Sequence, residues 1–204
     1  MESREKSAGE SSEEAASASA EPTPDSQPGR GLVIVNTGDG KGKTTAALGM
    51  AMRAVGGGLR VCVLQYIKGQ WKPGELKAAG MLPRFDYLPL GVGFTWTKTP
   101  EEHMAALRQA WAKTQEVVLD GPYDLVVLDE INYALALKKL PVEEVFTAAD
   151  VIDLLRRRPP ALHVVLTGRG AHPDIVAYAD LVTEMRLVKH PYQQGIRAAR
   201  GVEF

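Results

Sequence analysis

The residue types best suited to chemistry gather in one short stretch, VNTGDGKGKTTAALGM, at positions 35–50. Closely spaced glycines let backbone N–H groups turn inward around an anion without Cβ clashes. The Gly-Lys-Thr that ends the turn supplies an ammonium group for phosphate and a hydroxyl that can bind Mg²⁺. We therefore predict a phosphate-binding loop made by Gly38, Asp39, Gly40, Lys41, Gly42, Lys43, Thr44 and Thr45.

This loop departs from the common GxxxxGK[ST] pattern, which would place glycine at position 37. The residue there is Thr37, and the first glycine, Gly38, comes one residue late. Lys41 adds a second cation inside the loop. The structural alternatives are an ordinary glycine turn that caps a helix and, for Lys41, a side chain that faces solvent.

A second stretch, LVVLDE at 125–130, supports the same reading independently. Four apolar residues end in Asp129 and Glu130, so both carboxylates would lie at the carboxyl end of a buried strand. Asp129 is the expected Mg²⁺ ligand together with Thr44, directly or through water, with Mn²⁺ as an alternative ion. Glu130 is expected to bind a metal-bound water or a second substrate. The alternative is a strand that merely ends in acidic residues.

The elements that must position these residues alternate along the chain. β-Branched apolar runs predict strands at 31–37, 58–67, 123–130, 161–170 and 179–189. Helical patterns cover about 43–55, 99–119, 131–140 and 147–158, while 68–98 reads as a loop rich in glycine, proline and aromatic residues. The order indicates an α/β fold, a mainly parallel sheet with helices on both faces, and ligands outside the carboxyl ends of its strands.

Two of the predicted helices carry clear start signals. Thr99 and Glu102 form one capping box with Pro100 between them, and Thr147 and Asp150 form another. The first helix has an apolar stripe that predicts core packing for Met104, Leu107, Trp111 and Val118. The arginines at 156–158 suit the end of the second helix, with a phosphate site as the alternative.

Composition bounds the class of protein. The 204 residues are 45% hydrophobic and 24% charged, which is typical of a globular domain, and the net charge of −1 argues against a nucleic-acid coat. No apolar stretch is long enough to cross a membrane, so we expect a cytoplasmic protein. Cys62, the only cysteine, reads as a buried hydrophobic residue. Residues 1–30 predict a disordered Ser/Ala/Glu-rich tail, and 31–204 predict a single domain.

Taken with further stretches, the loop resembles a known family. TGDGKGKTTAALGMAMRAVGGGLRVCVLQYIKGQW, GVGFTW, LVVLDEINYAL, VVLTGRGAHPDIVAYADLVTEM and VKHPYQQGIRAARGVEF are similar, in order, to the cob(I)alamin adenosyltransferases of the cobalamin-biosynthesis, P-loop type. The resemblance covers 31–204 and implies a RecA-like P-loop NTPase fold, a homodimer and a flavin-dependent reductase as partner. It also implies transfer of the 5′-deoxyadenosyl group of ATP to Co(I) of a reduced corrinoid, with release of triphosphate.

In that reaction the loop would hold a leaving group. Lys41 and Lys43 are then expected to stabilise the departing triphosphate, and Arg53 to reach the nucleotide as its family counterpart does. Surface packing is the alternative for Arg53. Co(I) is already a strong nucleophile and carries no proton, so no general acid or base is assigned.

The resemblance also implies a corrinoid site. Phe94 and Trp96 would pack beneath the corrin and keep a lower axial ligand off cobalt, although alternating aromatics in a strand also suit a core. Glu130 and Arg169 complete the residues expected at the corrinoid or second-substrate site, Arg169 meeting phosphate or a corrin amide unless it only shapes its loop. His172, just before Pro173, is interpreted as structural.

Two other functional classes fit the loop. A P-loop ATPase or small-molecule kinase would transfer the γ-phosphoryl group and yield ADP, whereas adenosyl transfer yields triphosphate. A nucleotide-dependent regulator would bind ATP without corrinoid-dependent turnover. A GTPase is disfavoured because the guanine-reading Asn-Lys-x-Asp motif is absent from the sequence.

Overall fold

A computed structural model describes residues 29–67, 74–91 and 99–202 of the chain. These residues form one sheet whose six described strands are all paired in parallel, in the order β3-β2-β4-β5-β1-β6. The strands are β1 (Val33–Thr37), β2 (Val61–Gln65), β3 (Phe85–Pro89), β4 (Leu125–Asp129), β5 (His163–Thr167) and β6 (Leu181–Glu184). The predicted α/β class is confirmed.

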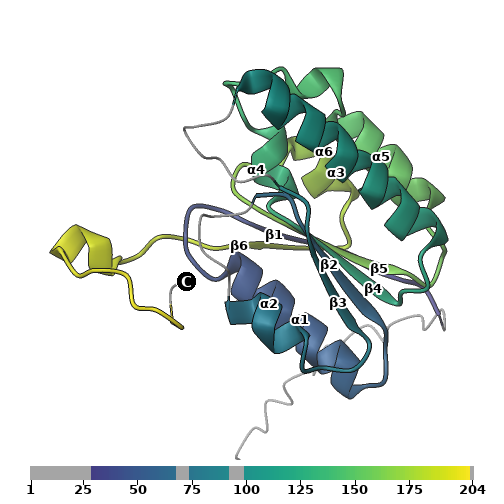
Figure 1. The fold of residues 1–204 in the computed structure, drawn as a ribbon, viewed down its shortest axis with the longest axis horizontal. Helices are drawn as coiled ribbons and strands as arrows, with labels where there is room; N and C mark the ends of the chain where they lie inside the picture. The colour runs from purple at the N-terminus through teal and green to yellow at the C-terminus, as the bar shows by residue number, and fades with distance from the viewer. Residues whose placement is uncertain (1–28, 68–73, 92–98, 203–204) are drawn as a thin grey trace, which may run out of the picture.

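Helices cover both faces of this sheet (Figure 1). α1 (Lys43–Gly56) and α2 (Gly74–Ala79) lie on one face. On the other face lie α3 (Pro100–Asp120), α4 (Ile131–Leu135), α5 (Ala148–Arg157) and α6 (Pro173–Tyr178). Two 3₁₀ turns, η1 (Val142–Glu144) and η2 (Pro191–Gln194), complete the described elements. In the described ranges no helix is both long and apolar enough to cross a membrane.

The alternation of side chains along each strand divides the interior into two cores. Val33, Val35 and Cys62 point toward the α3–α5–α6 face, whereas Ile34 and Val61 point toward α1. A parallel strand covered on both sides must be apolar on both sides, which is why these runs have no polar alternation. Cys62 is fully buried, as predicted, and burial raises the pKa of its thiol to about 12.

α3 begins as its sequence predicts. Thr99 accepts a hydrogen bond from the Glu102 N–H at 3.2 Å, and Glu102 accepts one in return from the Thr99 N–H at 2.8 Å. Trp111 of this helix is 8% exposed and stacks on Phe146, with ring centroids 4.7 Å apart and planes 15° apart. The predicted core role of Trp111 is confirmed, because offset stacking of this kind fills volume at the helix–loop contact.

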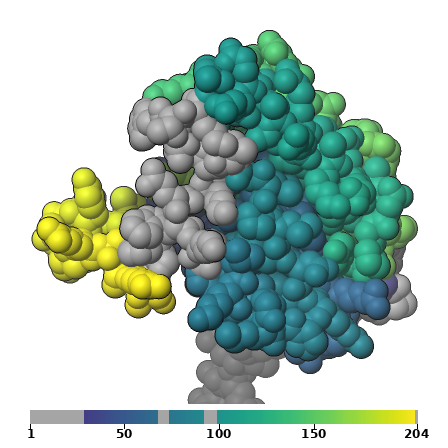
Figure 2. Space-filling model, viewed as in Figure 1, coloured from purple at the N-terminus to yellow at the C-terminus, as the bar shows by residue number. Residues whose placement is uncertain are grey.

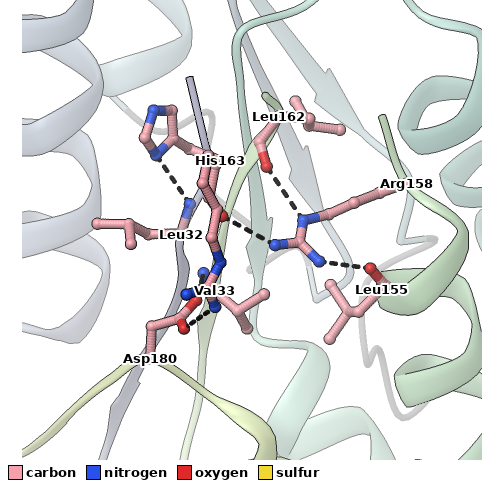
Figure 3. A network of polar contacts seen from close by, with 9 residues as sticks. Leu32, Val33, Leu155, Arg158, Leu162, His163 and Asp180 are labelled. Atoms are coloured by element: carbon pink, nitrogen blue, oxygen red, sulfur yellow. Dashed lines mark hydrogen bonds and ion pairs between the residues drawn. The ribbon is translucent and has the colours of Figure 1, made fainter. Parts of the chain in front are cut away.

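Arg158, at the end of α5, ties this helix to the amino ends of two strands (Figure 3). Its guanidinium donates to the carbonyl oxygens of Leu155, of Leu162 at 3.1 Å and of Gly31 at 2.9 Å. Carbonyls at a helix end lack partners within the helix, and a cation there also meets the negative end of the helix dipole. Arg158 therefore caps the end of α5, as the helix-end interpretation of the arginine run predicts. It lies at the amino ends of the strands, whereas ligands are expected at their carboxyl ends.

Several stretches differ from the predicted elements. α6 is not among the predicted helices, and the strand predicted for 179–189 ends at Glu184. Residues 68–98, read as a loop, contain α2 and β3, so the sheet has six strands instead of five. β3 (FDYLP) is short and ends in a proline, and it pairs with β2 along Val61↔Phe85 to Gln65↔Pro89. The helix predicted for 131–140 ends at Leu135, where the Leu137 N–H bonds to the Ala134 carbonyl oxygen at 3.3 Å in a tighter turn.

Candidate functional site

Most of the predicted site residues that the structure describes meet in one cleft at the carboxyl ends of β2 and β4, beside the start of α1. We call it the phosphate cleft. Of the predicted residues, its walls include Gly40, Lys41, Gly42, Lys43, Thr44, Thr45, Asp129, Glu130 and Arg169. Strands β1 and β4 are neighbours of β5 and not of each other, so a loop after β1 and acids after β4 come together only because the parallel sheet brings all carboxyl ends to one edge.

The loop between β1 and α1 is shaped by glycines at two left-handed positions. Gly38 has φ 93° and Gly42 has φ 109°, values that side chains with a Cβ rarely adopt. Gly42 is the N-cap of α1 and makes no side-chain cap bond, so the N-terminal N–H groups of this 14-residue helix remain available to an anion. Thr37, the departure from the common pattern, accepts a hydrogen bond on its hydroxyl from the Ala171 N–H at 3.2 Å.

Lys43 lies inside the loop. Its side-chain amine donates to the carbonyl oxygens of Gly38 at 2.8 Å and Gly40 at 2.6 Å, and the residue is 7% exposed. Burial lowers the pKa of this amine, and the nearby Glu130 carboxylate partly offsets that effect. A phosphate entering the loop would give the ammonium group a stronger, charged acceptor than the two carbonyls.

Asp129 is the most deeply buried carboxylate of the cleft, at 1% exposure. One of its oxygens accepts hydrogen bonds from the hydroxyls of Thr44 at 2.8 Å and Thr167 at 2.7 Å. Burial raises the pKa of Asp129, while these hydroxyl bonds lower it. A buried carboxylate beside a hydroxyl suits a hard divalent cation, because both groups offer oxygen ligands and the charge of the carboxylate would then be compensated.

The oxygens of Thr44 and Asp129 are suitable ligands for Mg²⁺. Among the described residues no cluster of three or more His, Cys, Asp or Glu side chains could hold a metal by themselves. Mg²⁺ does not need such a cage, since it is commonly held by one or two protein oxygens with phosphate oxygens and water. The Thr44 and Asp129 pair, 2.8 Å apart, therefore fits a nucleotide-bound Mg²⁺.

Glu130 follows Asp129 in a strained backbone conformation, with φ 62° and ψ 19°. Its N–H donates to the Thr167 hydroxyl at 2.9 Å, and the chain turns there directly from β4 into α4. Burial and the Asp129 charge raise the pKa of Glu130, while Lys43 and Arg169 lower it. A non-glycine residue in this region costs energy, and such strain concentrates at functional sites.

An apolar hollow adjoins the phosphate cleft. Ile67 lines both, and the hollow continues between α3 and α4 past Tyr66, His103 and Leu107. Phe94 and Trp96, the aromatics predicted at the second-substrate site, lie outside the described residues. Gly91, the last described residue before them, lies in the wall of the hollow.

Several predicted residues stand apart from the cleft wall. Gly38 and Asp39 belong to the loop but do not line the cleft, and Arg53 is exposed in the last turn of α1. His172 is the N-cap of α6, where its ring nitrogen Nδ1 accepts from the Asp174 N–H at 3.3 Å, in line with a structural role.

Sequence reasoning missed five residues of the cleft wall. Gln65 ends β2 and Tyr133 lies one turn into α4, so the rule that ligands bind at strand ends could have found both. No local pattern indicates the others, which are Ile67, Glu75 and Val202.

Comparison with known proteins identifies the family of the chain. The family described as ATP:corrinoid adenosyltransferase BtuR/CobO/CobP matches residues 29–204. The corrinoid adenosyltransferase of Escherichia coli K12 is 43% identical over 179 residues, which cover 86% of each chain. That of Salmonella typhimurium is 44% identical over 86% of each chain, and that of Sinorhizobium is 45% identical over 86% of this chain and 81% of its own. A solved type III secretion ATPase shares 21% identity at a TM-score of 0.38, too little for any argument.

Proposed function

Because the chain belongs to the ATP:corrinoid adenosyltransferase family, and so adenosylates corrinoids with ATP, we propose that its phosphate loop holds the triphosphate of ATP as a leaving group. The observation that supports this most directly is the buried Lys43 amine inside a glycine loop, next to the bonded pair Thr44 and Asp129. The rival reading, transfer of the γ-phosphoryl group, is not favoured by the relatives.

The proposed step forms one bond and breaks one. The electron pair of Co(I) attacks the 5′ carbon of the ribose, the carbon–cobalt bond forms, and the C5′–O bond breaks toward the triphosphate. No proton moves at the reacting atoms, so the absence of an assigned acid–base pair is chemically consistent. The protein then contributes position and charge: the loop N–H groups, Lys41 and Lys43 stabilise the negative charge that collects on the departing oxygen.

Mg²⁺, with Mn²⁺ as an alternative, would be held by Thr44 and Asp129 together with phosphate oxygens and water. A bound divalent cation neutralises part of the triphosphate charge. Thr44, Asp129 and Thr167 would position the cation. The Thr44 hydroxyl and the Asp129 carboxylate would hold this cation, while Thr167, which donates to the same carboxylate, would keep the carboxylate in place.

The corrinoid is proposed to bind at the phosphate cleft on the side where the apolar hollow adjoins it, since the cleft has a free volume of about 740 Å³ and the hollow only about 30 Å³. Phe94 and Trp96 are proposed to pack beneath the corrin ring and exclude an axial ligand, which raises the reduction potential of cobalt. Glu130 and Arg169 carry opposite charges and both act on the pKa of Lys43, which places them near it. We propose that these two residues contact the second substrate and that Arg53 contacts the nucleotide. Catalysis needs Co(I), so a flavin-dependent reductase is proposed as the electron donor, in the cytoplasm where ATP is supplied.

A homodimer is also part of this proposal. β6 is an edge strand whose four residues are exposed, including Leu181 at 48% and Val182 at 37%. Parallel strands are ordinarily covered on both faces, so an exposed apolar edge of this kind suits contact with a second copy.

One anaerobic assay tests the function. The purified protein is mixed with ATP, Mg²⁺ and pre-reduced cobalamin, the corrin spectrum is followed, and the phosphate products are separated. We expect a carbon–cobalt bond and tripolyphosphate in equal amounts, and loss of both when EDTA removes the metal. ADP and orthophosphate without alkylated corrin would instead establish the kinase or ATPase reading.

A further inference from the structure

The chain that follows β6 is attached to the phosphate loop. The Gly40 N–H donates to the Met185 carbonyl oxygen at 2.7 Å, and the Met185 N–H donates to the Thr37 carbonyl oxygen at 2.8 Å. These two bonds extend the β1–β6 pairing, whose last register pair is Thr37↔Glu184, directly into the loop. We call residues 185–202 the C-terminal arm.

The contact between arm and loop is too close for any side chain on the loop. A Cβ built on Gly40 would lie 2.7 Å from the carbonyl carbon and oxygen of Arg186. A Cβ on Gly38 would lie 2.5 Å from the Met185 carbonyl oxygen. These glycines therefore do more than turn the loop around an anion, because their outer side is where the arm packs.

The arm then leaves the body and comes back to the cleft. Figures 1 and 2 show it as a yellow projection with η2 at its far end, and in Figure 1 the chain turns back toward the loop at the C-terminus. On its return Val202 lines the same cleft as Lys41, Lys43 and Thr44. Val202 closes a turn in which its N–H bonds to the Ala199 carbonyl oxygen at 3.2 Å, and Arg200 lies inside that turn.

The described arm carries mainly positive charge. Residues 185–202 contain Arg186, Lys189, Arg197 and Arg200, and the acidic residues Glu184 and Glu203 flank this range in the sequence. The wall of the cleft contains three cations, Lys41, Lys43 and Arg169, as well as the carboxylates of Glu75, Asp129 and Glu130. The basic residues of the arm would add to the cations on this wall and favour a ligand with several negative charges. A triphosphate, with about four negative charges, is such a ligand.

The arginines at the two ends of the arm differ in whether an acidic side chain lies beside them in the described residues. At the fixed end, Arg186 lies 3.9 Å from the Glu184 carboxylate, which offsets part of its charge. At the returning end, Arg200 sits two residues from Val202 at the cleft wall. An arginine can bind two phosphate oxygens at once and stays charged at every physiological pH.

We propose that the C-terminal arm is a second phosphate-binding element, in which Arg200 contacts the triphosphate from outside the loop while Met185 holds the loop from behind. This inference rests on the proposed function, since it names a further residue for the same leaving group. Arg200 then adds to the leaving-group stabilisation that the loop and Lys43 provide.

Binding of inorganic tripolyphosphate to the full chain tests this role without catalysis. Calorimetry with Mg²⁺ is carried out on the parent protein and on Arg200→Gln, Arg200→Lys and Arg197→Gln. Arg197→Gln removes the same charge from the same arm but outside the turn at the cleft, and is the matched control. We expect about a ten-fold loss of affinity in Arg200→Gln, corresponding to about 1.4 kcal/mol, with partial recovery in Arg200→Lys and little change in the control.

A comparison of ligands separates charge recognition from folding. The affinity for AMP should change less than the affinity for ATP in Arg200→Gln, because a merely structural defect would weaken both alike. Equal tripolyphosphate affinity in Arg200→Gln and the parent, or equal losses in Arg200→Gln and Arg197→Gln, would overturn the role of the arm alone. Failure of the parent protein itself to bind tripolyphosphate would overturn both the arm and the proposed function of the loop.

Discussion

Replacement of the buried carboxylate Asp129 by asparagine should make the ligand-free protein more stable and the enzyme inactive. The variant keeps the shape of the site. Its side-chain oxygen can still accept from the hydroxyls of Thr44 and Thr167, which bond to Asp129 at 2.8 and 2.7 Å. Its new N–H₂ group replaces the oxygen that accepts from Gln65 Nε2 at 3.5 Å, so the Gln65 side-chain amide must turn over to bring its buried oxygen to this group. That Gln65 oxygen accepts no hydrogen bond from the described residues. The asparagine amide can then donate to the Gln65 oxygen, whereas the Asp129 carboxylate has only a long contact of 3.5 Å to Gln65.

The size of the stability gain follows from the charge. Burial raises the pKa of Asp129, so the folded protein binds a proton there more readily than the unfolded chain does. The stability from this group is thus present at low pH and is lost as the pH rises through the raised pKa. Asparagine does not ionise, so the variant does not lose this stability as the pH rises. We expect a gain on the order of 1 kcal/mol at neutral pH, or about 2–4 °C in melting temperature for a chain of this length.

Ligand binding should respond in the opposite direction. At one hundred times its Kd, Mg-ATP stabilises the parent by about 2.7 kcal/mol, or roughly 5–10 °C. The metal-dependent part of this shift should vanish in Asp129→Asn, together with adenosylation. The measurement is thermal unfolding with and without ATP and Mg²⁺ at several pH values. Asp120→Asn, which removes an exposed carboxylate at the end of α3, is the control and should stay within about 0.5 kcal/mol of the parent.

Two results would refute this reasoning. A ligand-free Asp129→Asn protein that is less stable than the parent at neutral pH would show that the hydroxyl bonds compensate the buried charge fully. A variant that keeps the magnesium-dependent shift would show that Asp129 is not the metal ligand. The stability difference should also shrink as the pH falls and the parent carboxyl gains its proton.

Three further changes have defined outcomes. Thr167→Val removes the hydroxyl that accepts from the Glu130 N–H at 2.9 Å, and should cost about 1–3 kcal/mol in urea unfolding, with Thr167→Ser close to the parent. Gly40→Ala places a methyl group 2.7 Å from an arm carbonyl and should raise the KM for ATP, whereas Gly49→Ala, exposed in α1 with open space around it, should stabilise by about 0.5–1 kcal/mol. Asp150→Ala should cost about 1 kcal/mol at neutral pH through loss of its capping bonds. Because those bonds lower the pKa of Asp150, the difference should disappear as the pH falls below about 3.9 in parallel urea titrations.

Much of the site was accessible from local sequence because local chemistry produces it. A glycine turn between an apolar strand and a helix must present N–H groups, so the loop at 38–45 and its Lys43 could be placed before the fold was known. The acids after LVVL, Asp129 and Glu130, lie at a strand end because the apolar run before them forms a buried strand, and both capping boxes begin their helices as predicted. Patterns of this kind depend on hydrogen bonds within a few residues.

The tertiary structure decided what depends on distant partners. β3 is a strand because β2 offers it a free edge, and Tyr133 lines the cleft because Glu130 bends the chain into α4 at φ 62°. Lys43 turns onto the loop's own carbonyls, and Met185, about 145 residues later in the chain, holds the Gly40 N–H.

The sequence by itself thus determined the α/β class, the glycine-rich loop before α1 and the acids at the end of β4, since each is specified by neighbouring residues. Only the folded chain shows the strand order and the contact between the loop and the C-terminal arm. It also identifies Gln65, Glu75 and Val202 as cleft residues. The physical reason is that sheet pairing and close backbone contacts join segments whose separation along the chain leaves no periodic signal in either one.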